Sequence, residues 1–233
     1  MRLPNDTERH AIVGTTGSGK TVFGLWALSH RNYDQKPWVI IDFKREPQIG
    51  AIPHLEEFGI DDAVPDEPGL YAVRPTPFDI DTGGVSDLLM RIYEQENTGV
   101  FIDEGYMIRP MDRGLRALLT QGRSKHIPMI CLAQRPAHIS PFLLSESEFK
   151  SVFYLEHPAD IDRINEWMPA CDPSKLPDHH SLYYQREGRQ LKRLAPCEPM
   201  DKVYERFDRR LASEPAPEYF DLFGRQIDSR PLI

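Results

Sequence analysis

The chain has 233 residues, of which 40% are hydrophobic and 27% are charged, so it can bury a core and is not disordered as a whole. Its net charge of −8 excludes a generally basic nucleic-acid coat protein. Three cysteines without paired spacing argue against a disulfide scaffold or a zinc knuckle, and the residues lead us to expect neither a membrane-spanning segment nor a secretory signal.

Apolar runs of strand length alternate with helical patterns from the amino terminus onward. Continuous β-branched and apolar runs are typical of strands covered on both faces, and apolar residues at helical spacing indicate helices. The stretch 44–82 is rich in proline and acidic residues, and within it we expect only one strand. The elements expected up to residue 103 are strands at 9–13, 38–43, 69–73 and 100–103 and helices at 21–30 and 85–96.

The second half continues this alternation and then changes to a hairpin. We expect helices at 112–125, 159–167 and 200–211, strands at 128–133 and 151–155, and an antiparallel hairpin of 181–184 with 190–194. Buried strands that alternate with helices predict an α/β protein with a mainly parallel central sheet flanked by helices. The C-terminal β-hairpin is expected to extend one edge of that sheet.

A phosphate-binding loop lies between the first strand and the first helix. The residues Gly14, Thr15, Thr16, Gly17, Ser18, Gly19, Lys20 and Thr21 satisfy the pattern G-x-x-x-x-G-K-[ST] completely. Glycines let backbone N–H groups surround the β-phosphate, and the following helix adds its first amides. Lys20 is placed to reach the β- and γ-phosphates, and the Thr21 hydroxyl to bind Mg²⁺. The sequence therefore predicts the P-loop NTPase fold.

The strand that starts at Val100 ends in two acids, Asp103 and Glu104. An acid at the carboxyl end of a strand beside the phosphate loop can hold the water shell of Mg²⁺, which favours Asp103 as the metal-side acid. The next residue can take a proton from the attacking water or orient it, so Glu104 is the candidate general base. Asp42 is the competing acid, and a solvated acidic turn is the alternative for the pair.

The strand after the acidic pair ends in a polar amide, Gln134, before Arg135 and Pro136. A neutral donor and acceptor at this place could bind the γ-phosphate or the attacking water and so report hydrolysis. An ordinary exit from strand to loop, with Pro136 ending the strand, explains the residues equally well. From the residues alone both interpretations stay open.

Together and in this order, these features resemble the FtsK–HerA superfamily of P-loop ATPases, whose members pump DNA through a ring that is usually a hexamer. The resemblance covers roughly residues 9–160. It rests on the phosphate loop, Val39–Lys44 with Glu46, Val100–Glu104, and 122–127 leading to 132–136. The glutamine after the acidic strand points to this branch. The chain looks most like the compact genome-packaging ATPases of tailless, membrane-containing viruses.

The resemblance implies an ATP hydrolase with ATP and Mg²⁺ as cofactors. By that resemblance, Lys20 and Thr21 bind phosphate and Mg²⁺. Asp103 and Glu104 act on the metal and on the attacking water, and Gln134 is the sensor of hydrolysis. Family members supply an arginine finger from the next subunit. Arg123 fits that place best and Arg116 is the second candidate, although a helix-surface arginine explains Arg123 equally well.

The implied function is a double-stranded DNA translocase that packages a viral genome into a preformed capsid. Its partners would be DNA, further copies of itself in a ring, and capsid or portal-vertex proteins, in the host cytoplasm or at the packaging vertex of the virion. The alternatives are another DNA pump of the same superfamily, in conjugation or in plasmid or chromosome transfer, and an assembly protein that uses ATP as a switch. We expect a P-loop ATPase domain at 1–200, with a proline-rich acidic insertion at about 44–82, and a C-terminal helix and tail at 201–233.

Charge is unevenly distributed along the chain. Residues 51–108 carry 2 basic and 13 acidic side chains, whereas 109–150 carry 7 basic and 3 acidic ones. A translocase moves along backbone phosphates, so Arg109 and Arg113, in the loop after the acidic pair, are the candidate DNA contacts, with surface ion pairs as the alternative. We expect an acidic outer or capsid-facing surface and a basic inner one. The pair His179 and His180 and the three cysteines lack ligand spacing and are interpreted as structural.

Overall fold

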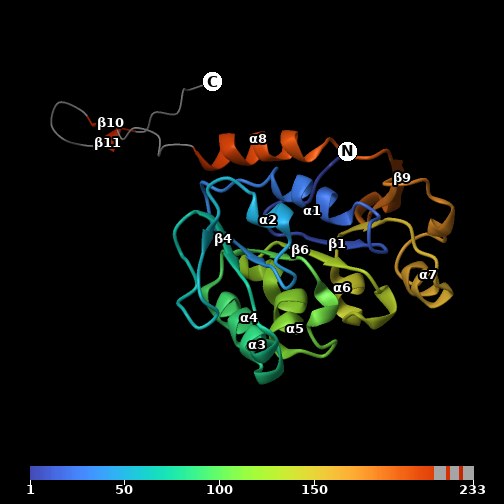
Figure 1. Cartoon of the computed structure of the whole chain (residues 1–233), viewed down its shortest axis with the longest axis horizontal. Coiled ribbons are helices and arrows are strands. Elements are labelled where there is room, and N and C mark those ends of the chain that lie inside the picture. The colour runs from blue at the N-terminus through green and yellow to red at the C-terminus, as the bar shows by residue number, and fades with distance from the viewer. Residues whose placement is uncertain (213–218, 221–225, 228–233) are drawn as a thin grey trace.

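A nine-stranded sheet forms the centre of the computed structural model, which describes residues 1–212, 219–220 and 226–227 (Figure 1). The strands are β1 (Arg9–Val13), β2 (Pro37–Ile41), β3 (Glu56–Glu57), β4 (Gly69–Val73), β5 (Gly99–Ile102), β6 (Met129–Ala133), β7 (Phe149–Val152), β8 (Ser181–Gln185) and β9 (Gln190–Leu194), with a separate pair β10 (Tyr219–Phe220) and β11 (Gln226–Ile227). Their order in the sheet is β3-β4-β2-β5-β6-β1-β7-β8-β9. All pairs from β3 to β7 are parallel, and β8 and β9 add an antiparallel edge.

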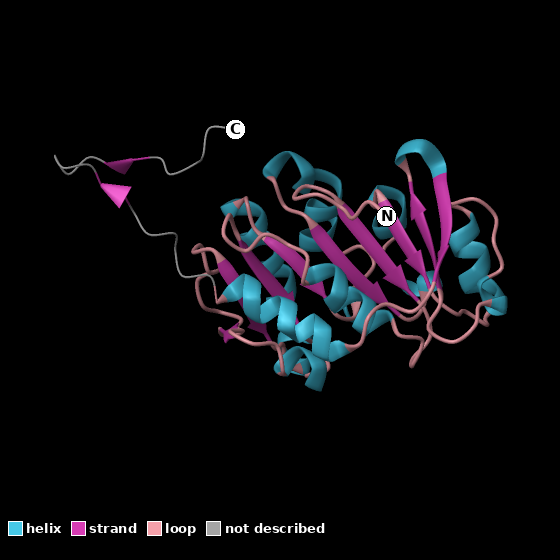
Figure 2. Cartoon of the chain, turned by 90° about the horizontal axis from the view of Figure 1, so that it is seen from above, coloured by secondary structure: helices cyan, strands magenta, loops and turns pink. Residues whose placement is uncertain are grey.

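Helices cover both faces of this sheet (Figures 1 and 2). They are α1 (Lys20–Leu28), α2 (Pro47–Gly50), α3 (Pro77–Thr82), α4 (Gly84–Gln95), α5 (Arg113–Gln121), α6 (Pro141–Glu146), α7 (Pro158–Asn165) and α8 (Met200–Leu211). Short 3-10 turns are η1 (Gly105–Met107), η2 (Gly122–Lys125), η3 (Pro136–His138), η4 (Pro173–Lys175) and η5 (Glu187–Arg189). Within the described ranges no helix combines the length and the apolar character that crossing a membrane requires.

The core consists of two apolar layers, one on each face of the sheet. Successive side chains of a strand point to opposite faces, so Ile12 and Phe101 belong to the layer under α1, α2 and α8. Their neighbours Val13 and Ile102 belong to the layer under α4, α5 and α6. Because both faces are covered, β1, β2, β5 and β6 are buried along their whole length.

The strand order determines which loops meet at the nucleotide side of the sheet. β6 lies between β1 and β5, and β2 lies on the other side of β5. The register pairs Val13 with Ala133 and Ile41 with Ile102, so the four carboxyl ends are at one edge of the sheet. The segments that follow β1, β6, β5 and β2 are therefore neighbours, which is where parallel α/β sheets bind their ligands.

The α/β architecture with a mainly parallel sheet, an edge hairpin and a final helix is confirmed. The stretch 44–82 holds more structure than the single expected strand, because α2, β3 and α3 lie in it as well. α3 begins with a capping box, in which the Thr76 hydroxyl and the Asp79 carboxylate bond each other's backbone N–H. β4 pairs in parallel with β2, so part of the expected insertion belongs to the central sheet.

Other elements also differ from the expected ones. The expected helix 112–125 ends as an α-helix at Gln121 and continues as η2, which His126 ends with a left-handed backbone φ of 57°. The strand expected at 151–155 begins earlier, at Phe149. α6 was not expected, since it has only six residues and starts at Pro141.

The last helix packs on the helix that follows the phosphate loop. Val203 and Phe207 of α8 are fully buried in the layer that contains α1. The Arg206 guanidinium donates to Ser29 Oγ at 3.2 Å, at the end of α1. A division of the chain at residue 200 stays a prediction, and most of the expected tail, from residue 213 on, lies outside the described residues.

Phe207→Ala is expected to lower the free energy of unfolding by about 3–5 kcal/mol, because the buried ring would leave a cavity between α8 and α1. Asp208→Ala is the matched control, since this neighbouring carboxylate is exposed and pairs with His54 at 2.9 Å. It should cost no more than about 1 kcal/mol. Urea denaturation measures both variants, and equal losses would contradict the assigned packing of α8.

Candidate nucleotide-binding site

The phosphate loop connects β1 to α1, in the context that the sequence predicts. A Cβ atom at Gly14 would lie 2.6 Å from Cβ of Phe153 and 2.7 Å from Oγ of Ser18, so any side chain there would clash. Gly19 caps α1 with φ of 94°, a left-handed conformation that glycine adopts readily. The Gly14 N–H donates to the Ala133 carbonyl at 3.2 Å, which anchors the loop on β6.

Lys20 and Thr21 begin α1 and line a cavity of about 550 Å³. The Lys20 side chain is buried, and its Nζ lies 3.5 Å from the Thr15 carbonyl oxygen. Burial lowers the pKa of Lys20, and the nearby Glu104 carboxylate opposes this shift. A lysine in these surroundings is stabilised in its charged form by bound phosphate anions.

Glu104 is a fully buried carboxylate with three hydrogen-bond donors. Its Oε1 accepts from the Gln134 backbone N–H at 3.1 Å. Its Oε2 accepts from Gln134 Nε2 at 2.9 Å and from Lys44 Nζ at 2.5 Å. The Thr16 hydroxyl donates to Oε1 of Gln134 at 2.9 Å. Hydrogen bonds at this one carboxylate thus join the phosphate loop to the segments that follow β6, β5 and β2. They also fix the orientation of the carboxylate, as a general base requires.

Asp103 carries a buried oxygen, Oδ2, for which the described residues provide no hydrogen-bond partner. Burial, together with the carboxylates of Glu46 and Asp42, raises the pKa of Asp103 to about 7. A buried acid among other acids calls for a cation, and Mg²⁺ prefers oxygen ligands. Asp103 and Thr21 line the same cavity, so the residues fit Mg²⁺ held by the Thr21 hydroxyl and, through water, by Asp103.

The competing acid, Asp42, is already partnered. Its Oδ2 accepts from Arg74 Nε at 3.1 Å, and its Oδ1 accepts from the Glu46 N–H at 3.0 Å. The described residues that line the cavity include Asp103 and Glu104 but not Asp42. The geometry therefore favours the pair at the end of β5.

The last third of the chain supplies a further wall of this cavity. His179, Pro196 and Cys197 line it beside the phosphate loop. The interpretation of His179 and Cys197 as structural residues without ligand spacing stays a prediction, and the sequence did not indicate that they line this cavity. They reach the loop only because the hairpin returns the chain past β7, and no local spacing indicates such a contact.

Lys44 is another residue of the cavity to which the sequence interpretation assigned no role. It follows β2 by three residues, and its contact with Glu104 depends on β2 lying next to β5. A lysine shortly after a strand end can be recognised in the sequence. Its contact with Glu104, however, can be predicted only from the strand order, which the sequence alone did not provide.

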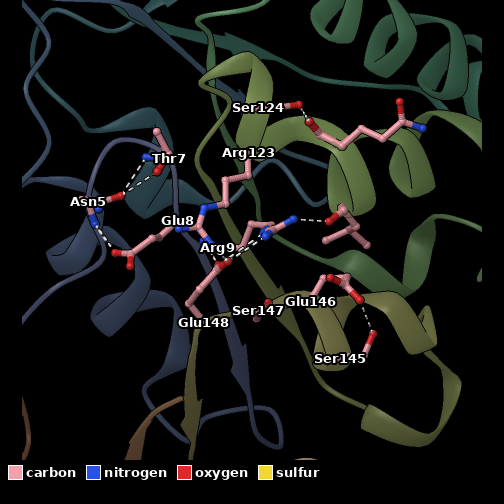
Figure 3. A network of polar contacts seen from close by, with 12 residues as sticks. Asn5, Thr7, Glu8, Arg9, Arg123, Ser124, Ser145, Glu146, Ser147 and Glu148 are labelled. Carbon is pink, nitrogen blue, oxygen red and sulfur yellow. Dashed lines mark hydrogen bonds and ion pairs between the residues drawn. The ribbon is translucent and has the colours of Figure 1, made fainter. Parts of the chain in front are cut away.

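Arg123 lies at the opposite end of the sheet from the phosphate loop. It belongs to η2, before β6, and its Nη1 is 3.8 Å from Oε1 of Glu148 (Figure 3). Glu148 is held by Arg9, the first residue of β1, whose Nη2 donates at 2.7 Å. The Arg123 side chain is 65% exposed. It faces away from its own nucleotide site and is accessible to another molecule, so its role as a finger stays a prediction.

The two candidate DNA contacts have different surroundings. Arg113 forms an exposed ion pair with Asp87. Arg109 is exposed, and the described part of the chain offers its guanidinium no hydrogen bond or ion pair; the same holds for Arg116. Since Lys125 also pairs with an acid of the 51–108 stretch, Glu96, part of the expected basic surface is neutralised locally.

These observations define a P-loop NTPase in which a glutamine-ended strand separates the phosphate-loop strand from the acidic strand. No family model matches the chain. It is 36% identical over 219 residues to the DNA packaging ATPase P9 of Enterobacteria phage PRD1, a match that covers 89% of this chain and 95% of P9. The chain belongs to the family of this DNA packaging ATPase.

Solved structures show that the fold itself is shared with other proteins. The genome packaging NTPase B204 from Sulfolobus turreted icosahedral virus 2, in complex with AMPPCP, is similar with a TM-score of 0.66 at 17% identity, over 84% of this chain and 100% of B204. The pCW3 conjugation coupling protein TcpA is similar with a TM-score of 0.52 at 15% identity, over 85% of this chain and 64% of TcpA. The resemblance to viral genome-packaging ATPases is confirmed by the relative that is 36% identical.

Asp103 predicts a pH dependence of stability in the absence of Mg²⁺ and nucleotide. A carboxyl whose pKa rises from 3.8 to about 7 binds, between those values, a proton that the unfolded chain has lost. Stability therefore falls as the pH rises through this window. Asp103→Asn removes the titration, so the wild type should lose more stability than the variant between about pH 5 and about pH 8. Urea denaturation at both pH values measures this, and equal losses would contradict the raised pKa.

Proposed function

We propose that this chain is an ATP hydrolase that drives double-stranded DNA into a preformed viral capsid and works as a ring of identical subunits. The family relationship to a DNA packaging ATPase supports the packaging role. The observation that carries the ATPase activity is one cavity in which the phosphate loop, the Asp103–Glu104 pair and Gln134 meet. A protein that uses ATP only as a structural ligand needs no oriented base beside its phosphates.

We assign a task to each residue, and its place in the cavity supports the assignment. Lys20 and the amides of the phosphate loop hold the β- and γ-phosphates. Glu104, oriented by Lys44 and Gln134, takes a proton from the attacking water. The Thr21 hydroxyl and, through water, Asp103 would hold Mg²⁺, which would supply neutralisation of phosphate charge.

Gln134 is suited to report the state of the γ-phosphate. It contacts Thr16 in the phosphate loop and Glu104 at the end of β5 at the same time. Any shift of its amide toward the phosphate alters both contacts, which supports its assignment as the sensor.

The contact with DNA is assigned to the loop that follows the acidic pair. This loop leaves the strand end that carries Glu104, so a change there can move a DNA contact. Arg109 is the stronger candidate of the two arginines, because Arg113 is paired with Asp87 and a backbone phosphate needs an available cation. Capsid or portal-vertex proteins are the further partners, and the host cytoplasm and the packaging vertex are the sites of action.

Glu104→Gln is expected to lower the rate of ATP hydrolysis by about 10²–10⁴-fold while ATP binding persists, because the amide cannot take a proton from water. In the wild type, long duplex DNA should stimulate hydrolysis. Steady-state ATPase assays with and without duplex DNA, together with a nucleotide-binding titration, test both expectations.

The matched control is Glu94→Gln, which changes the same group on the exposed face of α4. It should leave hydrolysis unchanged. If duplex DNA fails to stimulate the wild type and Glu104→Gln hydrolyses ATP normally, the translocase proposal is wrong.

Arg123→Ala is expected to lower hydrolysis by about 10³-fold or more if Arg123 stabilises the transferring phosphoryl group of the next subunit. Subunits with Lys20→Ala are inactive for a different reason. In a mixture of the two variants, some interfaces combine an intact Arg123 with an intact Lys20, so part of the activity should return. ATPase assays over a range of mixing ratios measure this complementation.

Lys125→Ala is the control in the same turn, since this lysine pairs with Glu96 and should be dispensable for hydrolysis. Arg116→Ala, mixed in the same way, tests the second candidate. Native mass spectrometry establishes that mixed rings form. Mixed rings without recovered activity would assign Arg123 to the structural pair with Glu148 instead.

A further inference from the structure

The nucleotide cavity has two chemically different walls. The charged side chains that line it come from the start of α1 and from the carboxyl ends of β2 and β5, and they are Lys20, Lys44, Glu46, Asp103 and Glu104. The C-terminal wall consists of His179, Pro196 and Cys197. Among the described lining residues, this wall contributes no carboxylate, lysine or arginine. Phosphates and Mg²⁺ match the charged wall, so the C-terminal wall suits a different part of the nucleotide.

His179 lies directly against the phosphate loop. Its Nδ1 and Cβ are 3.1 and 3.6 Å from the position that a Cβ atom on Gly19 would occupy. Its backbone φ of 59° is in the left-handed region, which a non-glycine residue adopts at a cost that the surrounding structure must offset. Within the described residues, no hydrogen bond engages its ring, so the imidazole is available to a ligand that extends from the phosphate loop.

Pro196 and Cys197 are held in place by the elements on either side of them. They link β9 to α8. The next residue, Glu198, forms an ion pair with Arg206 of α8, and Phe207 fixes α8 on α1. The C-terminal wall is therefore attached to the helix that begins at the phosphate loop, and it forms a preorganised surface beside the phosphates.

We propose that the C-terminal wall binds the base and ribose of the nucleotide, with the imidazole of His179 stacked on the base and with Pro196 and Cys197 beside it. A purine base is flat and uncharged, and such a ring stacks on aromatic side chains. The base extends away from the phosphates, and this wall borders the loop at Gly19. The inference rests on the proposed ATPase function and adds the residues that recognise the adenosine part.

Cys197 provides a direct test, because a bound base would cover its thiol. Alkylation of each cysteine by N-ethylmaleimide is followed by mass spectrometry, alone, with Mg²⁺ and ATPγS, and with Mg²⁺ and inorganic tripolyphosphate. At about ten times its dissociation constant, ATPγS should slow the reaction of Cys197 about tenfold by mass action. Tripolyphosphate should give no such protection. Cys171 is the internal control, since its backbone N–H is held by Asn165 at 2.9 Å and it is not a lining residue.

The three possible outcomes of the alkylation experiment can be distinguished. Protection by ATPγS alone supports a base at the C-terminal wall. Equal protection by ATPγS and tripolyphosphate would show that the phosphates alone close the wall, and absence of protection under saturating ATPγS would place the base elsewhere. Either result overturns the proposal.

Variants of His179 provide an independent test. His179→Ala should weaken ATPγS binding by about tenfold, the size expected for loss of one stacking contact, and should leave tripolyphosphate binding unchanged. His179→Phe keeps a flat ring and should retain most of the affinity for ATPγS. His180→Ala is the adjacent control and should bind both ligands normally, because His180 is not a lining residue.

A phosphate contact by His179 would give the opposite pattern. Both His179 variants would then lose tripolyphosphate affinity, and the stacking proposal would be wrong. The binding titrations also separate this failure from failure of the proposed function. Wild-type protein that binds neither ATPγS nor tripolyphosphate contradicts the ATPase proposal itself, whereas normal binding with unaffected variants contradicts only the C-terminal wall.

Discussion

The arrangement of the site depends on one buried carboxylate, Glu104. A fully buried charge is tolerated only when it is paired and hydrogen-bonded, and here Lys44 and two donors of Gln134 meet that requirement. These donors follow the carboxyl ends of β2 and β6, the two strands that flank β5, and Glu104 follows the end of β5. The carboxylate therefore holds three strand ends in register, and through Gln134 it also holds Thr16 of the phosphate loop. Loss of any donor leaves charge uncompensated in the interior, so stability and hydrolysis share the same contacts.

The sequence predicted those elements whose signals are local. The phosphate loop has a contiguous motif, and α8 begins and ends where its amphipathic spacing indicates, at Met200 and Leu211. The order of the strands has no local signal, because it depends on which crossovers pack best over the whole sheet. That order places β6 between β1 and β5, and so brings Gln134 within reach of both Thr16 and Glu104. From the sequence alone, a sensor role for Gln134 and an ordinary exit from the strand stayed equally open. The contacts of its amide bring Gln134 to the cavity, and its role as the sensor stays a prediction.

The residues that the sequence did not indicate are those that reach the cavity through tertiary structure. His179 and Cys197 come from opposite sides of the edge hairpin and meet the phosphate loop only after that hairpin has paired with β7.

The same reasoning applies to charge. The acidic 51–108 stretch and the basic 109–150 stretch are separate in sequence, yet Arg113 pairs with Asp87. The summed charge of a segment therefore does not predict the charge of the surface on which its residues lie.

The position of Arg123 is relevant to the proposed assembly of this chain into a ring. Arg9, which holds Glu148 beside Arg123, is five residues before Gly14 of the phosphate loop, a distance of about 17 Å along β1 at about 3.3 Å per residue. A single subunit thus carries its phosphate loop at one edge of the sheet and its proposed finger at the other. Packing that brings the finger edge of one copy to the nucleotide edge of the next is head-to-tail, and head-to-tail contacts between identical subunits close only as rings or continue as filaments. A finger acting in trans therefore requires head-to-tail packing, which is also the packing of the proposed ring, so the position of Arg123 at the far end of β1 would connect catalysis to assembly.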